Sequence, residues 1–358
     1  MQSADAVSLV VDRGGFCPHE LTIIRDRPDV PLGGGQVRLA VDCFSLSANN
    51  LTYALLGDRF GYWSLFPMPE PWGIVPVWGF ATVVETRHPE VAQGERLYGL
   101  WPMASQAVIE PGRINGRLIV ENSPHRRPLS PAYNSYFRVA ADPIHAPGTE
   151  DRQSVIRPLF ITSYLLDGLV GRTAAWGSDT VVVTSASSKT ALGLGWLLRR
   201  DRPGIRTIGL TSERHSGAIT GLGIFDEVAT YDALPDVSGV AIVDFSGNQT
   251  LLDRLRGRSR PVHLCRVGMT HGRDAGEVSA EKPGEEFFFA PDAIIAAVAE
   301  LGAAGFDAAL ANATRDFIDA SRGWLTIDAV RGADAVRDAW SRVRSGHGDP
   351  TSAIVASL

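Results

Sequence analysis

The sequence of 358 residues predicts an α/β protein with two domains, because a β-rich first third is followed by regular alternation of strands and helices. Residues 36–46 alternate apolar and polar side chains at a period of two, which is typical of a half-buried antiparallel strand. From residue 179 onward, short apolar runs alternate with helical segments, as in a doubly wound parallel sheet. We therefore expect one domain at 1–150, completed by 322–358, and a second domain at 151–321.

Further strands of the first domain are predicted at 75–85, 93–100 and 106–110, each bounded by turn residues. The region 113–149 is rich in Pro, Asn and His and is expected to form loops. The second domain should hold a sheet of six parallel strands, at 180–185, 205–210, 227–230, 240–244, 262–267 and 286–289. Helices are predicted at 189–200, 216–222, 250–256, 292–321 and 329–345, before a last strand at 353–357.

Charge and composition exclude several classes of function. The 34 basic and 40 acidic residues give a net charge of -6 and form no basic stripe, so nucleic acid is not an expected partner. The start of the chain does not resemble a secretory signal, and polar residues and glycines interrupt the most apolar stretch, 294–310, so no membrane span is expected. Three cysteines, Cys17, Cys43 and Cys265, are too scattered for a disulfide framework or a structural zinc site. We expect a cytoplasmic protein that binds small molecules.

The segment Thr180–Ala191 reads as a buried strand, a turn of small residues and the start of a helix. Free backbone N–H groups and the positive end of a helix dipole make such a turn suited to an anion. The candidate ligands are Ser187, Ser188, Lys189 and Thr190. The alternative, that small residues only allow the strand and the helix to pack closely, is about as good from these residues alone.

Three segments resemble motifs of the medium-chain dehydrogenases and reductases, within their zinc-free quinone oxidoreductase and enoyl reductase branch. They are the first active-site loop (Phe44–Asn50), a strand like Gly-Asp-Arg-Val-Tyr-Gly (Gln93–Gly99) and the helix before the first nucleotide strand (Ile161–Leu166). The resemblance implies a GroES-like β domain and a Rossmann-type nucleotide domain inserted into it. It also implies a reductase that uses NADPH and, by analogy, forms a homodimer.

Two departures from that family pattern bear on its cofactors. Ser47 stands where the zinc-using branch has its first cysteine, so we expect no catalytic metal. Ala186, Ser188 and Ala191 stand at the three glycine positions of the dinucleotide fingerprint, where glycine permits a tight turn and close approach of a pyrophosphate. The hydroxyls of the turn could donate to a pyrophosphate instead.

Coenzyme preference is set after the second strand of such a sheet, where a basic side chain can receive a 2′-phosphate. Ser212 and Arg214 resemble the residues that bind the 2′-phosphate in the NADPH-using branch, although the negative charge of Glu213 could oppose a phosphate. The alternative is that these polar residues only form a solvated loop. Gly268 follows the fifth strand and is a further candidate for contact with the cofactor.

Catalytic candidates occur in both predicted domains. His271 follows the fifth strand at the edge where doubly wound sheets bind ligands, and a histidine can transfer protons near neutral pH. Asn50 and Tyr53, near the first active-site loop, could polarise a carbonyl or donate a proton. An aromatic group that follows them could line an apolar substrate pocket or belong to the core; its pocket candidates are Tyr62, Trp63 and Phe66.

The sequence therefore predicts a zinc-independent oxidoreductase that transfers a hydride from NADPH to a small carbonyl or conjugated enone compound. A second reading is a cofactor-independent hydrolase or carbon–carbon bond lyase on the same scaffold, in which His271, with Asp244, activates a serine or a water. A third reading is a non-catalytic protein that binds a small molecule in its aromatic pocket.

Overall fold

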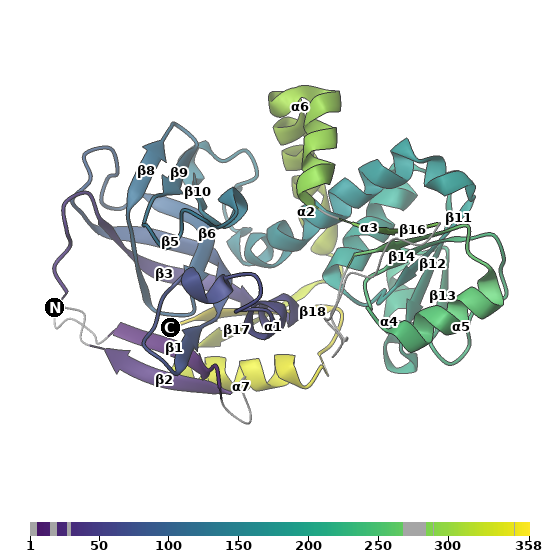
Figure 1. The fold of residues 1–358 in the computed structure, drawn as a ribbon, viewed down its shortest axis with the longest axis horizontal. Coiled ribbons are helices and arrows are strands. Elements are labelled where there is room, and N and C mark those ends of the chain that lie inside the picture. The colour runs from purple at the N-terminus through teal and green to yellow at the C-terminus, as the bar shows by residue number, and fades with distance from the viewer. Residues whose placement is uncertain (1–5, 15–19, 27–29, 268–283, 289, 347) are drawn as a thin grey trace. The chain divides into compact units, whose positions relative to one another are not determined.

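The computed structural model describes all residues except 1–5, 15–19, 27–29, 268–283, 289 and 347 (Figure 1). The described chain divides into two compact units. The first comprises residues 1–155, 325–348 and 352–358, and the second comprises 156–324 together with 349–351. Residues 349–351 thus pack with the second unit, although their neighbours on both sides belong to the first.

The first unit is built on a large mixed sheet. Its strands follow the order β17-β18-β3-β5-β6-β10-β9-β8, and β7 also pairs with β3. The β3–β5 pairing is antiparallel and contains two register irregularities, which bend the sheet. The strands are β3 (Val37–Leu46), β5 (Pro76–Thr86), β6 (Arg96–Pro102), β7 (Gln106–Ile109), β8 (Pro111–Ile114), β9 (Leu118–Glu121), β10 (Ser135–Arg138), β17 (Thr326–Arg331) and β18 (Ser352–Ser357).

A smaller sheet and two helices complete the first unit. The order β2-β1-β4 is antiparallel throughout. A short helix follows β3 and a longer one precedes β18, with single 3-10 turns between strands. These elements are β1 (Ala6–Asp12), β2 (Leu21–Asp26), β4 (Trp72–Ile74), α1 (Ala48–Leu55), α7 (Ala333–Arg344), η1 (Tyr62–Ser64), η2 (Pro131–Tyr133) and η3 (Val139–Ala141).

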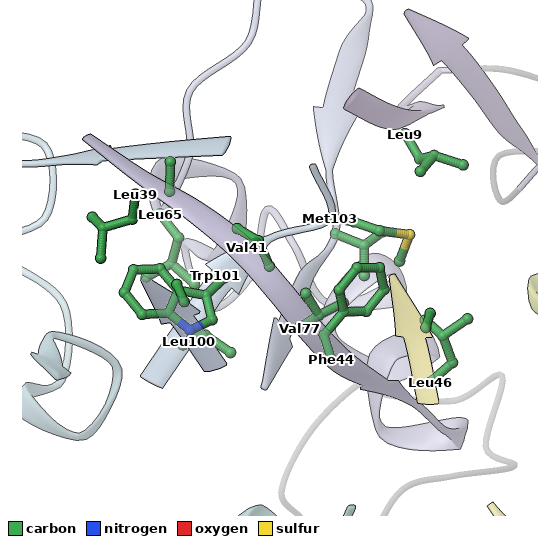
Figure 2. Close-up of a cluster of buried hydrophobic side chains, with 14 of the residues drawn as sticks. Leu9, Leu39, Val41, Phe44, Leu46, Leu65, Val77, Leu100, Trp101 and Met103 are labelled. Carbon is green, nitrogen blue, oxygen red and sulfur yellow. The ribbon is translucent and has the colours of Figure 1, made fainter. Parts of the chain in front are cut away.

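The core of the first unit forms along β3, whose side chains alternate between buried and half-buried over residues 37–42, as the sequence predicted, whereas residues 44–46 are buried in succession after the register irregularity between Val41 and Cys43. Figure 2 shows Phe44, Val77 and Met103 lying together beside this strand, and none of the three is exposed to solvent. Trp101 stacks on Tyr136 with ring centroids 4.4 Å apart, and its indole N–H donates to the Gly79 carbonyl. Burial of these large side chains stabilises the unit by removing apolar area from water.

The second unit contains a parallel sheet of six strands in the order β13-β12-β11-β14-β15-β16. The order changes direction at β11, so the turns after β11 and β14 leave the sheet on opposite sides of a switch point. Figure 1 shows helices packed against this sheet. The strands are β11 (Thr180–Thr184), β12 (Arg206–Thr211), β13 (Glu227–Thr230), β14 (Ala241–Asp244), β15 (His263–Arg266) and β16 (Glu285–Phe287), and the helices are α2 (Glu150–Arg172), η4 (Ala174–Gly177), α3 (Lys189–Asp201), α4 (Glu213–Leu222), α5 (Gln249–Ser259) and α6 (Ala290–Ser321).

The structure confirms the α/β class and the six-stranded parallel sheet, and it corrects two local predictions. The region 113–149 is not all loop, because β9 and β10 form within it and pair with each other. The predicted helix 329–345 is wrong at its start, where β17 pairs in parallel with β18. All three strands are short and are stabilised by pairing with another strand, which local periodicity does not report.

Helix α6 is more apolar than the sequence reading allowed. Residues Asp292–Ser321 have the length and composition of a helix that could cross a bilayer, and 11% of an apolar stretch of 18 residues within them is buried in the protein. Gly302 leaves helical geometry with φ 70°, so the helix is broken into two shorter segments at that residue. Ile295 and Leu301 are exposed on the first of these segments.

Two strands of the first unit approach each other closely at Gly79, opposite Phe44 on β3. A β-carbon at position 79 would stand 2.0 Å from the Cys43 carbonyl oxygen and 2.7 Å from Phe44 Cα. We expect Gly79→Ala to lower the free energy of unfolding by about 3 kcal/mol, because the two strands must separate. Urea unfolding measures this change. The control is Gly217→Ala in α4, where a β-carbon meets no atom within 4 Å and should stabilise by about 0.5–1 kcal/mol. Equal unfolding midpoints for the two variants would contradict the close contact.

Candidate functional site

The carboxyl ends of the parallel strands place several polar segments along one edge of the second unit's sheet. Because all six strands run in the same direction, the turns that follow them meet at the same edge. The polar segments follow β11, β12, β13 and β14, and they are 185–188, 212–215, Tyr231 and 245–248. This edge is the candidate ligand site of the second unit.

The turn between β11 and α3 depends on an unusual backbone conformation at Ser185. Its φ is 49°, in the left-handed region that favours glycine. The residue that needs a glycine-like conformation is therefore Ser185. The sequence analysis had placed the first glycine position of the fingerprint one residue later, at Ala186. Ala186 is fully buried instead.

Tyr231, directly after β13, holds this turn. Burial raises the pKa of Tyr231, and polar interaction of its phenol oxygen with the side chain and the backbone of Ser185 opposes the rise. The phenol therefore lies beside the turn.

Further donors of the turn remain directed at the edge of the sheet. The Ser188 side chain caps α3 by accepting from the Ala191 N–H at 3.2 Å. Within the described part of the chain, the N–H groups of Ser187 and Thr190 have no acceptor, as expected at the first turn of a helix. The side chains of Ser187, Ser188 and Thr190 are half-buried, so the turn is not sealed from solvent.

Lys189, the first residue of α3, turns its side chain to residues 349–351. Its Nζ donates to the Pro350 carbonyl oxygen at 2.8 Å. Burial lowers the pKa of Lys189 to about 8, and attraction by the Asp349 carboxylate opposes that shift. Lys189, which the sequence predicted to bind an anion, therefore lies at the turn and already donates a hydrogen bond to an acceptor within the protein.

The turn after β12 carries the predicted coenzyme-selecting residues. Ser212 is the N-cap residue of α4 in extended conformation, and its side chain makes no capping hydrogen bond. Arg214 is exposed in the first turn of that helix, so its guanidinium is accessible to a ligand. Glu213 is exposed beside it.

Asp244, at the end of β14, is a structural residue. Its carboxylate has no solvent exposure and accepts from the hydroxyls of Thr184 and Ser246, both at 2.6 Å. The backbone N–H groups of Ser246 and Gly247 also donate to it. Thr184 is the last residue of β11, and Ser246 and Gly247 lie in the turn after β14, so the carboxylate ties the two central strands together at the candidate edge.

Two predicted site residues, Gly268 and His271, lie outside the described residues. The described chain reaches Val267, whose N–H donates to the Asp244 carbonyl directly after β15. Their predicted roles stay predictions.

In the first unit, α1 presents Tyr53 to a set of aromatic side chains. The Tyr53 oxygen accepts two hydrogen bonds, from Asn49 Nδ2 at 2.9 Å and from Trp78 Nε1 at 3.0 Å. The hydroxyl hydrogen is therefore left to donate. Burial is the main cause that raises the pKa of Tyr53 well above its ordinary value, so the phenol stays protonated at physiological pH.

The structure divides the predicted pocket residues. Tyr62 packs edge-on against Tyr53 with centroids 4.8 Å apart, and its hydroxyl lies 3.3 Å from that of Tyr133. Trp63 faces elsewhere: it borders a cavity of about 260 Å³ whose lining includes Arg13. Phe66 packs under the buried guanidinium of Arg126, 4.9 Å from the ring centroid.

Asn50 is buried and engaged at both ends of its side-chain amide. Its Oδ1 accepts from the Ser47 N–H at 2.8 Å, which caps α1, and its Nδ2 donates to the Pro76 carbonyl at 3.0 Å. Asn50 thus fixes the start of α1 against β5, and through α1 it fixes Tyr53.

No group of three or more His, Cys, Asp or Glu side chains able to hold a metal occurs among the described residues. Cys43 is half-buried and Cys265 is buried, and burial raises the pKa of both thiols. Cys17 is outside the described residues.

The sequence reading missed three contributors to the candidate edge: Ser185, Tyr231 and the segment 349–351. Tyr231 directly follows a predicted strand, so a polar aromatic residue at a carboxyl end was a usable signal. The segment 349–351 gave no signal, because it lies more than 150 residues from the turn that it contacts.

A family model described as "Protein of unknown function (DUF2855)" matches residues 44–349. CurA of Vibrio vulnificus, solved in complex with NADPH, aligns over 99% of this chain and 99% of its own, with 13% identity and a TM-score of 0.58. The yhdH oxidoreductase of Salmonella enterica, in complex with NADP, aligns over 98% of this chain and 99% of its own, with 14% identity and a TM-score of 0.59. Comparison with curated proteins found no sequence match.

A third solved structure, the CurF ER cyclopropanase from the curacin A biosynthetic pathway, aligns over 99% of both chains, with 14% identity and a TM-score of 0.60. These likenesses extend over nearly the whole of each chain. They confirm that the chain has the fold that the resemblance predicted.

The left-handed conformation of Ser185 gives a direct test of the turn. Ser185→Gly should be more stable than Ser185→Ala by about 1 kcal/mol, because both variants lose the hydroxyl but only glycine adopts positive φ without strain. Urea unfolding of the two variants measures the difference. An alanine variant as stable as the glycine variant would show that residue 185 does not hold this conformation.

Proposed function

The chain belongs to the DUF2855 family, whose model covers residues 44–349, and we propose that it is an NADPH-dependent oxidoreductase acting on a small carbonyl or conjugated enone compound. The observation that carries this proposal is the turn between β11 and α3. It combines a left-handed residue, donors at a helix N-terminus and a lysine at the carboxyl edge of a doubly wound sheet. Structures of the same fold have been solved with NADPH or NADP, which supports this choice of ligand.

The residues of the edge fit a dinucleotide by their chemistry. Backbone N–H groups of Ser187 and Thr190 suit a pyrophosphate, and the Lys189 ammonium adds charge beside them. Ser212 and Arg214 would receive the 2′-phosphate after β12. NADPH would supply the hydride, and the protein would bind and orient the coenzyme.

Tyr53 is the proposed proton donor of the first unit. With its oxygen accepting from Asn49 and Trp78, the hydroxyl has one direction left in which to donate, toward a carbonyl oxygen of a substrate. Tyr62 would form an apolar wall beside it. His271 is retained as a second candidate for proton transfer and Gly268 as a cofactor contact. Asn50 is assigned a positioning role through the capping of α1.

Three further properties belong to the same proposal: independence of zinc, a cytoplasmic location and assembly as a homodimer. The serine at position 47, in place of a cysteine ligand, supports the first. The homodimer rests on the family resemblance alone.

The central experiment is a titration of the protein with NADPH, NADH and NADP+, followed by nicotinamide fluorescence and by calorimetry. We expect saturable binding of NADPH. Failure of all three coenzymes to bind at millimolar concentration would reject the reductase and leave the hydrolase, lyase and binding-protein readings.

Arg214 should discriminate between the coenzymes. Arg214→Ala should weaken NADPH binding about 10- to 100-fold and NADH binding little, since only NADPH carries a 2′-phosphate that can form a charge-assisted hydrogen bond. The control is Arg254→Ala, which removes an exposed arginine of α5. Equal losses for NADPH and NADH would remove Arg214 from the 2′-phosphate site.

Two variants test the proton donors once a substrate is found by screening carbonyl and enone compounds with NADPH. Tyr53→Phe and His271→Gln should each keep local shape, and the one that removes the donor should lower kcat roughly 10²- to 10⁴-fold with little change in coenzyme affinity. Stopped-flow measurement of NADPH oxidation gives both quantities. Near-normal turnover by both variants would eliminate both assignments.

A further inference from the structure

Lysine is rare in this protein. The 34 basic residues consist of 32 arginines and two lysines, Lys189 and Lys282. One of these two stands at the first position of α3, where a cation opposes the helix dipole. Position 189 therefore keeps an amine in a chain that uses guanidinium groups almost everywhere else.

The surroundings of Lys189 account for an amine at this position. Its Nζ lies 2.8 Å from the carbonyl oxygen of Pro350, a buried residue. An ammonium is a compact point charge, whereas a planar guanidinium with five donors needs more acceptors and more space. Burial lowers the pKa of Lys189 to about 8, because it removes solvent from the ammonium.

The segment that Lys189 holds is short and makes its own turn. The Asp349 carboxylate accepts from the backbone N–H and the hydroxyl of Thr351, at 2.8 and 2.7 Å. The same carboxylate is exposed and attracts both Lys189 and His215, which lie at the starts of α3 and α4. Residues 349–351 thus bring a carbonyl and a carboxylate to the positive ends of two helices.

These two acceptors match the charge and hydrogen-bonding character of a phosphate group. We propose that Lys189 is a latch: in the ligand-free protein it holds residues 349–351 against the first turn of α3 through the Pro350 carbonyl, and a bound phosphate or pyrophosphate replaces that carbonyl and releases the segment. The identity of the anion as the pyrophosphate of NADPH rests on the proposed function. The latch itself requires only an anion at the turn.

The two lysines make the latch directly observable. Protein labelled with 13C at lysine Cε should give two lysine signals, which Lys282→Met assigns. The Lys189 signal should titrate with a midpoint near pH 8, and addition of inorganic pyrophosphate or NADPH should shift it and raise the midpoint, since an anion stabilises the charged form. An ordinary lysine midpoint, about 10.4, that neither ligand moves would overturn the proposal.

Hydrogen exchange followed by mass spectrometry tests the released segment. Anion binding to the wild type, or Lys189→Met without ligand, should speed exchange in the peptide that contains Asp349–Thr351 about tenfold, the effect expected for loss of a charge-assisted hydrogen bond. Lys189→Arg tests the need for a compact charge and should also speed exchange. Lys282→Met is the matched control and should leave the peptide unchanged. Unchanged exchange in Lys189→Met would overturn the latch.

The two proposals fail in different ways. If NADPH binds by fluorescence while the Lys189 signal and the exchange of 349–351 stay unchanged, the latch is wrong and the oxidoreductase stands. If NADPH does not bind but pyrophosphate shifts the signal and releases the segment, the latch stands and the coenzyme assignment is wrong.

Discussion

The left-handed conformation of Ser185 is the constraint on which the candidate ligand site depends. The left-handed conformation costs a residue with a β-carbon about 1–2 kcal/mol of conformational free energy, so neighbouring contacts must stabilise Ser185 in it. The phenol of Tyr231 interacts with the side chain and the backbone of Ser185, and the next residue, Ala186, is fully buried. Because Ser185 reverses the chain directly after β11, it sets where α3 begins and where the N–H groups of Ser187 and Thr190 point. Serine with a tyrosine partner thus does here what a glycine does alone in the usual fingerprint.

The second support of the same edge is the buried carboxylate of Asp244. Several hydrogen bonds from hydroxyl and backbone donors satisfy it. These donors come from the end of β11 and from the turn after β14, on the two sides of the switch point in strand order, which fixes the spacing between β11 and β14 at their carboxyl ends. A rigid edge of this kind is what a ligand site needs, since it positions donors before the ligand arrives.

The sequence predicted the fold better than it predicted the site. All six parallel strands were found because buried strands and amphipathic helices alternate strongly there, whereas β9, β10 and β17 were missed because each is stabilised by its pairing rather than by its own pattern. Lys189 was identified as a candidate anion ligand, but Pro350 was not, because a contact over that separation leaves no local trace. Tyr53 was selected from its place near a loop motif, while its donors Asn49 and Trp78 became evident only through geometry.

The contacts of Lys189 also change how the affinity of the edge for an anion should be understood. A helix N-terminus with a lysine on its first residue carries positive charge that must be balanced whether or not a ligand is present. Here Pro350 and Asp349 balance it within the protein. The free energy of binding an anion is therefore the free energy of its own interaction with Lys189 minus that of the contacts with Pro350 and Asp349 that it replaces. A site with strong electrostatic interactions can thus show moderate affinity. A chain that has alanine and serine at the glycine positions of the fingerprint, and a lysine between them, gains donors at this edge, and it also gains internal partners that an incoming ligand has to displace.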